Sequence, residues 1–290
     1  MTVSKIFDKT LCTLGEGPMW HPKRNSLIWF DILSMCMYER GLYDKKPNKF
    51  QFNNYVSACG WINDKEILIA TSKSLDIFNF ENRSLKSLVD LESENSITRP
   101  NDGRTDPFGG FWISTMGIEN ESEAGSIYRF YKGELRKLFS KISVPNSICF
   151  SPDGASGYFS DSSSHIIMAV RLDSNGWPVS SPEIFIDFRS EGLIPDGSVV
   201  DKQGCLWNAQ WGSSRVAQYS PSGELLKTIQ IDAPNSSCPE FGGENGSTIF
   251  VTSARCLLSK KELATAPMSG AVFFAESMTA GQLAPRILLD

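Results

Sequence analysis

The stretch FGGFWIST, residues 108–115, places two glycines in front of a short run of aromatic and β-branched residues. Glycine favours a turn, and the run that follows is typical of a buried strand. Five similar runs recur, so that the six centres lie near Trp29, Leu68, Trp112, Tyr158, Trp207 and Phe250. Their separation of roughly 40 to 50 residues is the length of a four-stranded propeller blade. The sequence therefore predicts an all-β fold, a six-bladed β-propeller with four-stranded blades.

The segments between these runs are also strand-like. SLDIFNFENRSLKSLV, GSIYRFYKGELRKLF and RVAQYSPSGELLKTIQ each contain two short apolar runs joined at Gly, Asn or Ser, which is the pattern of a β-hairpin. Helical periodicity over ten or more residues is hard to find. Because a ring of blades needs no internal linker, we expect residues 1–290 to form a single propeller domain.

Closure of the ring requires a partner for the last blade. The segment VSKIFD, residues 3–8, is expected to pair with a final blade formed by GAVFFAE, residues 270–276, and PRILLD, residues 285–290. The alternative is a loose N-terminal tail, as chain ends often are.

Composition restricts the possible partners. The chain is 41% hydrophobic and 21% charged, with a formal net charge of −5 and no long run of Lys or Arg, so neither nucleic acid nor an anionic membrane surface is an expected partner. The N-terminus does not resemble a signal peptide and no stretch is apolar enough to span a bilayer, so we expect a soluble, cytoplasmic protein. Seven scattered cysteines without C-x-x-C spacing are expected to be buried thiols.

Four polar residues stand out because each comes just before one of the expected inner strands. They are Glu16 in LGEGPMWHP, Asn101 in RPNDG, Asn146 in VPNSICFSPDG and Asp196 in IPDGSVVDKQG. Any one of them could simply stabilise a turn. Their repeated placement instead suggests side chains that face a common cavity. Two carboxylates and two amides offer oxygen ligands suited to Ca²⁺, Mg²⁺ or Mn²⁺ and usable by Zn²⁺.

The same segments carry a resemblance to a known family. GEGPMW, RPNDGRTDPFGGFWISTM, VPNSICFSPDG, IPDGSVVDKQGCLWNAQWGSSRV and FGGENGSTIFVTSA follow one another in the order of the motifs of the senescence-marker-protein/gluconolactonase family. That family includes regucalcins, sugar lactonases and luciferin-regenerating enzymes. The resemblance runs through nearly the whole chain, and it implies a six-bladed propeller with one divalent metal ion at the mouth of its channel.

The resemblance also implies roles for individual residues. Glu16, Asn146 and Asp196 match the metal ligands, and Arg99 and Asn101 match positions that contact the substrate, Asn101 also lying beside the ion. Glu119, three residues after the Met of the S-T-M segment, matches a further substrate position. Glu121 and Glu123 lie in the same loop, and the sequence leaves open which of the three faces the site, although Glu119 is preferred.

Other chemistries have weaker support. The chain has only two histidines, His21 and His165, in different blades, and both are expected to be structural. This disfavours a Ser-His-Asp triad, and no G-x-S-x-G elbow, P-loop or dinucleotide-binding glycine motif is present.

The resulting hypothesis is metal-assisted hydrolysis of a sugar lactone, with Asp196 as the general base. The main alternative is a regucalcin-like calcium-binding protein without turnover. A scaffold propeller that binds peptides would explain the blades but not the polar residues. The sequence distinguishes neither the lactone, nor the ion, nor the oligomeric state.

Overall fold

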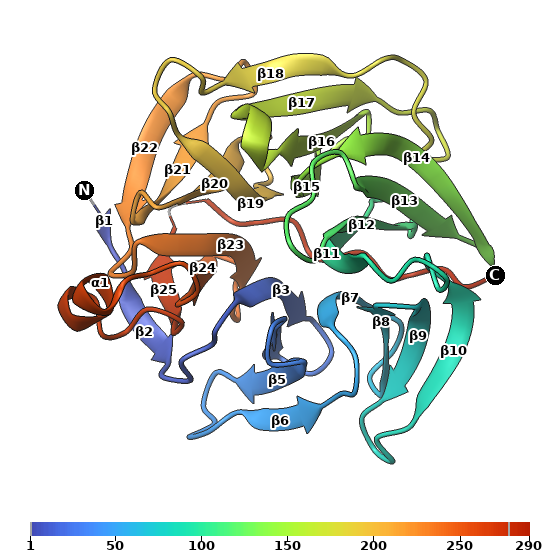
Figure 1. Cartoon of the computed structure of the whole chain (residues 1–290), viewed down its shortest axis with the longest axis horizontal. Helices are drawn as coiled ribbons and strands as arrows, with labels where there is room; N and C mark the ends of the chain where they lie inside the picture. Colours follow the sequence, from blue (N-terminus) through green and yellow to red (C-terminus); the bar gives the residue numbers. More distant parts are fainter. Residues whose placement is uncertain (1, 278) are drawn as a thin grey trace.

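The computed structural model describes residues 2–277 and 279–290. Six antiparallel sheets are arranged in a ring, with the chain passing from one sheet to the next around it (Figure 1). This confirms the prediction of a six-bladed β-propeller. We number the blades 1 to 6 in the order in which their innermost strands occur in the chain.

The strands are given blade by blade, from the innermost to the outermost. Blade 1 contains β3 (Gly15–His21), β4 (Ser26–Asp31), β5 (Cys36–Gly41) and β6 (Asn48–Gln51), and blade 2 contains β7 (Val56–Trp61), β8 (Glu66–Thr71), β9 (Ser74–Asn79) and β10 (Leu85–Asp90). Blade 3 contains β11 (Thr98–Thr105), β12 (Phe111–Gly117), β13 (Gly125–Tyr131) and β14 (Glu134–Ile142), and blade 4 contains β15 (Pro145–Phe150), β16 (Ser156–Asp161), β17 (Ile166–Arg171) and β18 (Glu183–Asp187). Blade 5 contains β19 (Ile194–Val200), β20 (Leu206–Trp211), β21 (Arg215–Tyr219), β22 (Leu225–Gln230) and the added β1 (Thr2–Val3), and blade 6 contains β23 (Asn235–Gly242), β24 (Thr248–Ala254), β25 (Val272–Glu276) and β2 (Lys5–Asp8).

The N-terminal segment closes the ring, as predicted, but it serves two blades. Lys5–Asp8 forms the outermost strand of blade 6 and pairs antiparallel with β25, while Thr2–Val3 pairs parallel with β22 of blade 5. Residues 2–8 are therefore tied to two sheets and do not form the loose tail.

The prediction for PRILLD, residues 285–290, is wrong. This segment forms no strand; it runs across the ring, where the Ile287 amide donates to the Trp61 carbonyl and the Leu288 amide to the Gly109 carbonyl, both at 2.9 Å. Ile287 is buried among apolar side chains of blades 2 and 3. The red C-terminal trace in Figure 1 follows this path between the blades. Apolar alternation here reflects docking against two blades rather than strand pairing.

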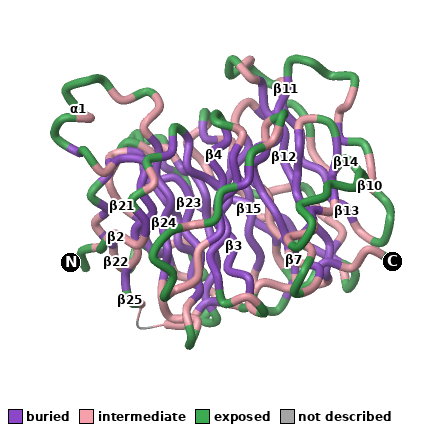
Figure 2. Tube along the Cα trace, turned by 90° about the horizontal axis from the view of Figure 1, so that it is seen from below, coloured by how far each residue is buried: buried purple, intermediate pink, exposed green. Residues whose placement is uncertain are grey.

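The core lies between neighbouring blades. All six run centres identified in the sequence fall in second strands and are buried, and Trp29, Trp112 and Trp207 of blades 1, 3 and 5 are completely so. Figure 2 shows the buried strands through the middle of the ring and the exposed loops above and below. The cysteines are free thiols, six of them buried as expected and Cys256 half-buried.

Each innermost strand carries a one-residue bulge at a corresponding place. In blade 1, Glu16 pairs with Phe30 and Met19 with Ile28, so β3 advances by three residues while β4 advances by two, and the other five blades repeat this step. Such bulges bend a strand and redirect its side chains, and they are common beside active sites. The propeller thus has six similar kinks around its axis.

In the part of the chain that the structure describes, helix is confined to two short segments. The helix α1 (Lys260–Thr265) begins after Ser259 with a reciprocal capping box to Glu262, and the 3₁₀ turn η1 (Ser162–Ser164) joins β16 to β17. In Figure 2, α1 and the loop leading into β11 rise on the same side of the ring. No helix in the described part of the chain is long and apolar enough to cross a membrane.

His21, at the end of β3, has a structural role as expected. The Arg24 amide donates to its Nδ1 at 3.3 Å, so Nε2 carries the proton and donates to the Asn63 carbonyl at 3.0 Å. Burial lowers the pKa of this imidazole. His165 also bonds a backbone carbonyl, that of Leu193.

We predict that His21 makes stability depend on pH. Its folded pKa lies below that of the unfolded chain, so the unfolded state binds more protons and stability is lost as the pH falls below about 6.5. The buried carboxylates titrate in both proteins, so the contribution of His21 is the difference between wild type and His21→Gln: urea unfolding should show the variant less stable at pH 8, with the difference shrinking as the pH falls to 5. An unchanged slope in the variant would contradict the assignment.

Candidate functional site

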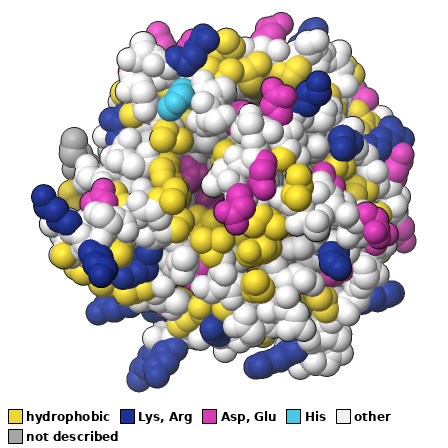
Figure 3. Space-filling model, viewed as in Figure 1, with side chains coloured by type: hydrophobic (Ala, Val, Ile, Leu, Met, Phe, Trp, Pro, Cys, Tyr) yellow, Lys and Arg dark blue, Asp and Glu magenta, His cyan; other side chains and the backbone are white. Residues whose placement is uncertain are grey.

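The innermost strands bring an excess of negative charge to the axis of the propeller. They contribute four carboxylates, Glu16, Asp102, Asp196 and Glu240, but only the two guanidiniums of Arg99 and Arg104. With four negative and two positive groups, the formal charge is −2 when all are ionised. The carboxylates are buried, and Figure 3 shows acidic side chains in and beside a hollow near the centre of the face viewed.

Near the starts of the innermost strands, three predicted residues form a hydrogen-bonded chain. Arg99 Nη1 donates to Asn101 Oδ1 at 2.9 Å, and Asn101 Nδ2 donates to Asn146 Oδ1 at 2.9 Å. Asn146 Nδ2 then donates to the Ser162 hydroxyl at 2.9 Å. This series of hydrogen bonds joins blades 3 and 4 and fixes the orientation of both amides.

Side chains of blades 4 and 5 hold the backbone around Asp196 through hydrogen bonds. The Ser162 hydroxyl donates to the Pro195 carbonyl at 2.6 Å, and the Asp196 carbonyl accepts from the Ser147 hydroxyl and, at 3.2 Å, from Asn208 Nδ2. Ser147 adopts a φ of 60°, an uncommon left-handed conformation for a residue other than glycine, in the bulge beside Asn146. Asp196 therefore reaches the channel from a backbone with little freedom to move.

Glu16 and Asp196 repel each other in a site shielded from water. Burial raises the pKa of Glu16 to about 8, with a further contribution from the charge of Asp102, while its bond from the Gly17 amide and the charge of Arg99 act in the opposite direction. Burial also raises the pKa of Asp196, and the nearby charges of Glu16 and Asp102 add to the effect. The influence of Glu16 on Asp196 indicates that the two carboxylates lie in one region of the channel, while their role as metal ligands stays a prediction.

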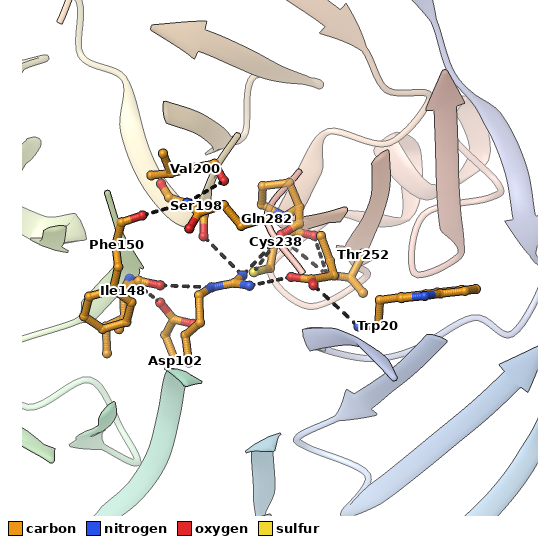
Figure 4. A network of polar contacts seen from close by, with 12 residues as sticks. Trp20, Asp102, Ile148, Phe150, Ser198, Val200, Cys238, Thr252 and Gln282 are labelled. Carbon is orange, nitrogen blue, oxygen red and sulfur yellow. Dashed lines mark hydrogen bonds and ion pairs between the residues drawn. The ribbon is translucent and has the colours of Figure 1, made fainter. Parts of the chain in front are cut away.

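Deeper in the channel, Arg104 lies beside a second group of carboxylates, Asp102 and Glu240, and offsets their charge. Its guanidinium pairs with Glu240, and it donates to the carbonyls of Ile148 and Ser198, each at 3.2 Å. Asp102 lies beside it and accepts the Ile148 amide at 2.7 Å (Figure 4). The cation brings blades 3, 4, 5 and 6 together at the axis.

The C-terminal segment covers the far end of this layer. Gln282 Nε2 donates to the carbonyls of Phe150 at 3.0 Å and Val200 at 3.2 Å, linking the segment to blades 4 and 5 (Figure 4). A small cavity of about 50 Å³ lies between Arg104, Glu240 and residues 282–285. Access to Glu16 and Asp196 is therefore from the opposite face.

The structure corrects one aspect of the sequence prediction. Glu16, Asn101, Asn146 and Asp196 were expected in the stretches leading into the inner strands, but they lie within the innermost strands β3, β11, β15 and β19, at or next to the bulges. Pro-Asn-Asp-Gly and Pro-Asp-Gly resemble turns because a bulge needs similar backbone freedom. Sequence reasoning also missed Asp102, Arg104 and Glu240, although the first two belong to the quoted segment RPNDGR.

Comparison with known proteins supports the family resemblance. The family model described as "SMP-30/Gluconolactonase/LRE-like region" matches residues 14–255. The chain belongs to this family. It is 31% identical over 280 residues to an L-arabinolactonase of Azospirillum brasilense, covering 94% of this chain and 92% of that protein, and 30% identical over 262 residues to a 6-deoxy-6-sulfogluconolactonase of Pseudomonas putida, covering 90% of each.

One solved structure resembles this chain in both fold and sequence. It is described as a calcium-binding protein, regucalcin, from Agrobacterium tumefaciens, and it matches with a TM-score of 0.97 and 37% identity over 100% of each chain. The relatives thus include both lactonases and a protein named for binding calcium.

The residues at the mouth suit a divalent cation. Within the described ranges 2–277 and 279–290, no three His, Cys, Asp or Glu side chains form a metal-binding cluster. The candidate set is of a different kind, namely two carboxylates with an amide oxygen, as hard cations accept. Two buried carboxylates beside a single guanidinium must either hold a proton or be compensated by a cation, so the donor set is compatible with the ion that the family resemblance implies.

Glu119 lies away from the buried residues. It is exposed in the loop between β12 and β13, while Glu121 turns back so that its Oε2 accepts the Glu119 amide at 3.0 Å. Because Thr98 pairs with Gly117, this loop lies at the same end of blade 3 as Arg99. A substrate contact by Glu119 remains a prediction.

Gly17 provides a test of how the bulge positions Glu16. Its φ is 53°, and an added Cβ would clash with the Ser57 carbonyl oxygen of blade 2. We predict that Gly17→Ala lowers the free energy of unfolding by about 2 kcal/mol or more, through unfavourable φ and the clash together.

Gly212→Ala is the matched control, because Gly212 also has a positive φ of 78° but an added Cβ there meets nothing within 4 Å. Urea unfolding should show a loss of only about 1 kcal/mol at this position. Equal losses in the two variants would contradict a close approach of blades 1 and 2 at Gly17.

Proposed function

We propose that this protein is a metal-dependent lactonase that opens a sugar lactone, acting as a single propeller domain. The observation that carries the proposal is the uncompensated pair of buried carboxylates, Glu16 and Asp196, beside the oriented donors Arg99 and Asn101. Carboxylate pairs are expensive to bury unless a cation or a catalytic task requires them. The lactonases among the relatives support the choice of reaction.

The proposed cofactor is one divalent ion, Ca²⁺, Zn²⁺, Mn²⁺ or Mg²⁺, held by Glu16, Asn146 and Asp196. Asn146 Oδ1 already accepts one bond from Asn101 and has a second lone pair available. When bound, such an ion supplies Lewis acidity toward a carbonyl oxygen and lowers the pKa of an attacking water.

Arg99 and Asn101 are placed to orient the substrate. Arg99 is almost fully buried, yet its Nε has no hydrogen-bond partner among the described residues. A buried donor without a partner is costly, and an oxygen atom of a bound ligand would satisfy it. We therefore assign Arg99 to a hydroxyl or carbonyl oxygen of the lactone, with Asn101 holding the guanidinium in place. Glu119 would reach the sugar hydroxyls from the loop above.

Asp196 is the proposed general base. It accepts a proton from the attacking water as the water oxygen bonds to the lactone carbonyl carbon. The bond between that carbon and the ring oxygen then breaks, and the proton passes to the ring oxygen as it becomes a hydroxyl. The product is the open-chain hydroxy acid, and no oxidant or reductant is required.

A second candidate function is calcium binding without turnover, favoured by the description of the related Agrobacterium tumefaciens protein. The same ligands would serve it, but it gives no task to the unpartnered Arg99 Nε. Release of acid from a panel of aldonolactones, measured with each of the four ions, separates the two: hydrolysis supports the lactonase, and tight Ca²⁺ binding with no hydrolysis of any lactone supports the alternative.

We predict that Asp196→Asn lowers lactone hydrolysis by about two orders of magnitude or more, because the amide keeps an oxygen ligand but cannot accept the proton. Metal occupancy must be measured on the same sample. Asp232→Asn, at an exposed position, is the control and should keep wild-type activity. Full activity in a metal-loaded Asp196→Asn variant would rule out the base role, whereas an empty site would show only that Asp196 is a ligand.

A further inference from the structure

A second hollow lies on the face of the propeller that carries the mouth of the site. It has a volume of about 320 Å³ and is bordered by loops of blades 1, 2 and 3, including Asn53, Asn54, Ser72 and Lys73. Thr98, the first residue of β11, and Ile118, the neighbour of Glu119, also line it. We call this hollow the blade 1–3 groove.

The groove displays polar side chains that a ligand could contact. Asn53 and Asn54 are exposed on it, and the Ser72 hydroxyl is buried without a hydrogen-bond partner among residues 2–277 and 279–290. The lining otherwise consists mainly of Ser, Asn, Thr and Tyr, and its Lys73 and Glu94 cancel in charge. Amides and hydroxyls without net charge suit a neutral ligand rich in hydroxyl groups.

Two residues connect the groove to the proposed substrate-binding position. Thr98 directly precedes Arg99 in β11, and Tyr55 directly precedes β7, the innermost strand of the neighbouring blade 2. The Tyr55 ring packs against the apolar cluster of blades 1 and 2, so its position is fixed. A ligand held by Arg99 could therefore extend past Tyr55 into the groove.

The wall beside Thr98 is also well ordered by hydrogen bonds. Glu92 accepts from the hydroxyls of Thr98 at 2.5 Å, Thr115 at 3.1 Å and Tyr128 at 2.6 Å, which ties the loop before β11 to three strands of blade 3. Pre-ordered walls reduce the entropy lost when a ligand binds. The groove is thus suited to recognition.

On the basis of the proposed function, we propose that the blade 1–3 groove is a subsite for a second sugar unit, and that the substrates are aldonolactones bearing a neutral glycosyl substituent. The volume of about 320 Å³ leaves room for a group larger than one hydroxymethyl, such as a hexose unit. Asn53, Asn54 and Ser72 would bond the hydroxyls of this unit.

The test compares cellobionolactone, which carries a glucosyl substituent, with gluconolactone, both with the metal-loaded protein. We expect kcat/KM to be at least about fivefold higher for cellobionolactone in the wild type, the effect of one useful hydrogen bond. Asn53→Ala/Asn54→Ala should remove this preference, chiefly through KM, and leave kcat/KM for gluconolactone within about twofold. Asn48→Ala, at an exposed position on β6, is the matched control.

The outcomes separate the subsite from the lactonase function. Hydrolysis of gluconolactone without preference for cellobionolactone, or equal losses on both lactones in the double variant, would overturn the subsite and keep the function. If neither lactone is hydrolysed, the function fails, and calorimetric titration with cellobionic and gluconic acids decides the subsite. Tighter binding of cellobionic acid that the double variant loses would support it, and equal binding would overturn it.

Discussion

The organisation of the site follows from the charge buried along the axis of the propeller. Six strands that crowd around one channel present four carboxylates and two guanidiniums, and burying unpaired carboxylates costs several kcal/mol each. Deeper in the channel, Arg104 offsets this cost because it pairs with Glu240 and lies beside Asp102. Near Glu16 and Asp196, Arg99 is the one guanidinium among the described residues, and it donates to Asn101. The proposed cation site is therefore at the mouth, where the carboxylates are less compensated than in the middle of the channel.

The one-residue bulges explain how strands from different blades supply such a site. In a regular strand alternate side chains face opposite sides, so a strand beside a narrow channel directs only every second residue to it. The bulge interrupts this alternation at the same level in every blade. Carboxylate or amide groups from blades 1, 3, 4 and 5 can then meet at one height, while Gly17 lets blade 2 approach blade 1 closely.

The sequence was sufficient for the fold because its signals were local and repeated. A turn followed by an apolar run recurs six times, and each predicted centre lies in a second strand. The C-terminal segment PRILLD has the same alternation, but its partners are Trp61 and Gly109, far away in sequence, so pattern alone could not show that it docks across two blades. The candidate site residues were proposed from motif order, yet their location in strands was missed because a bulge and a turn use the same residues.

The layer of Asp102, Arg104 and Glu240 could not be identified in this way, for a physical reason. Arg104 joins Glu240 across more than a hundred residues, and a charged residue in a strand is usually exposed. Asp102, Arg104 and Glu240 can be expected to meet only once the charged residues on the six innermost strands are counted. That count requires the strands to be known first. The Asp and Asn residues of the mouth were easier to find because they sit beside Pro and Gly.

The division between strands and loops has a consequence for how ligands are selected. Glu16, Asn146 and Asp196 belong to innermost strands fixed by neighbours on both sides, so a change there disturbs charge balance and packing together. The blade 1–3 groove is bordered mainly by loops, whose exposed residues such as Asn53 and Asn54 support little else in the molecule. Substitution in these loops can alter the groove without affecting the buried carboxylates. If the proposed lactonase function holds, the strands would then supply the charged centre and the Arg99 and Asn101 contacts, while the loops of the groove would adjust which sugar derivative fits.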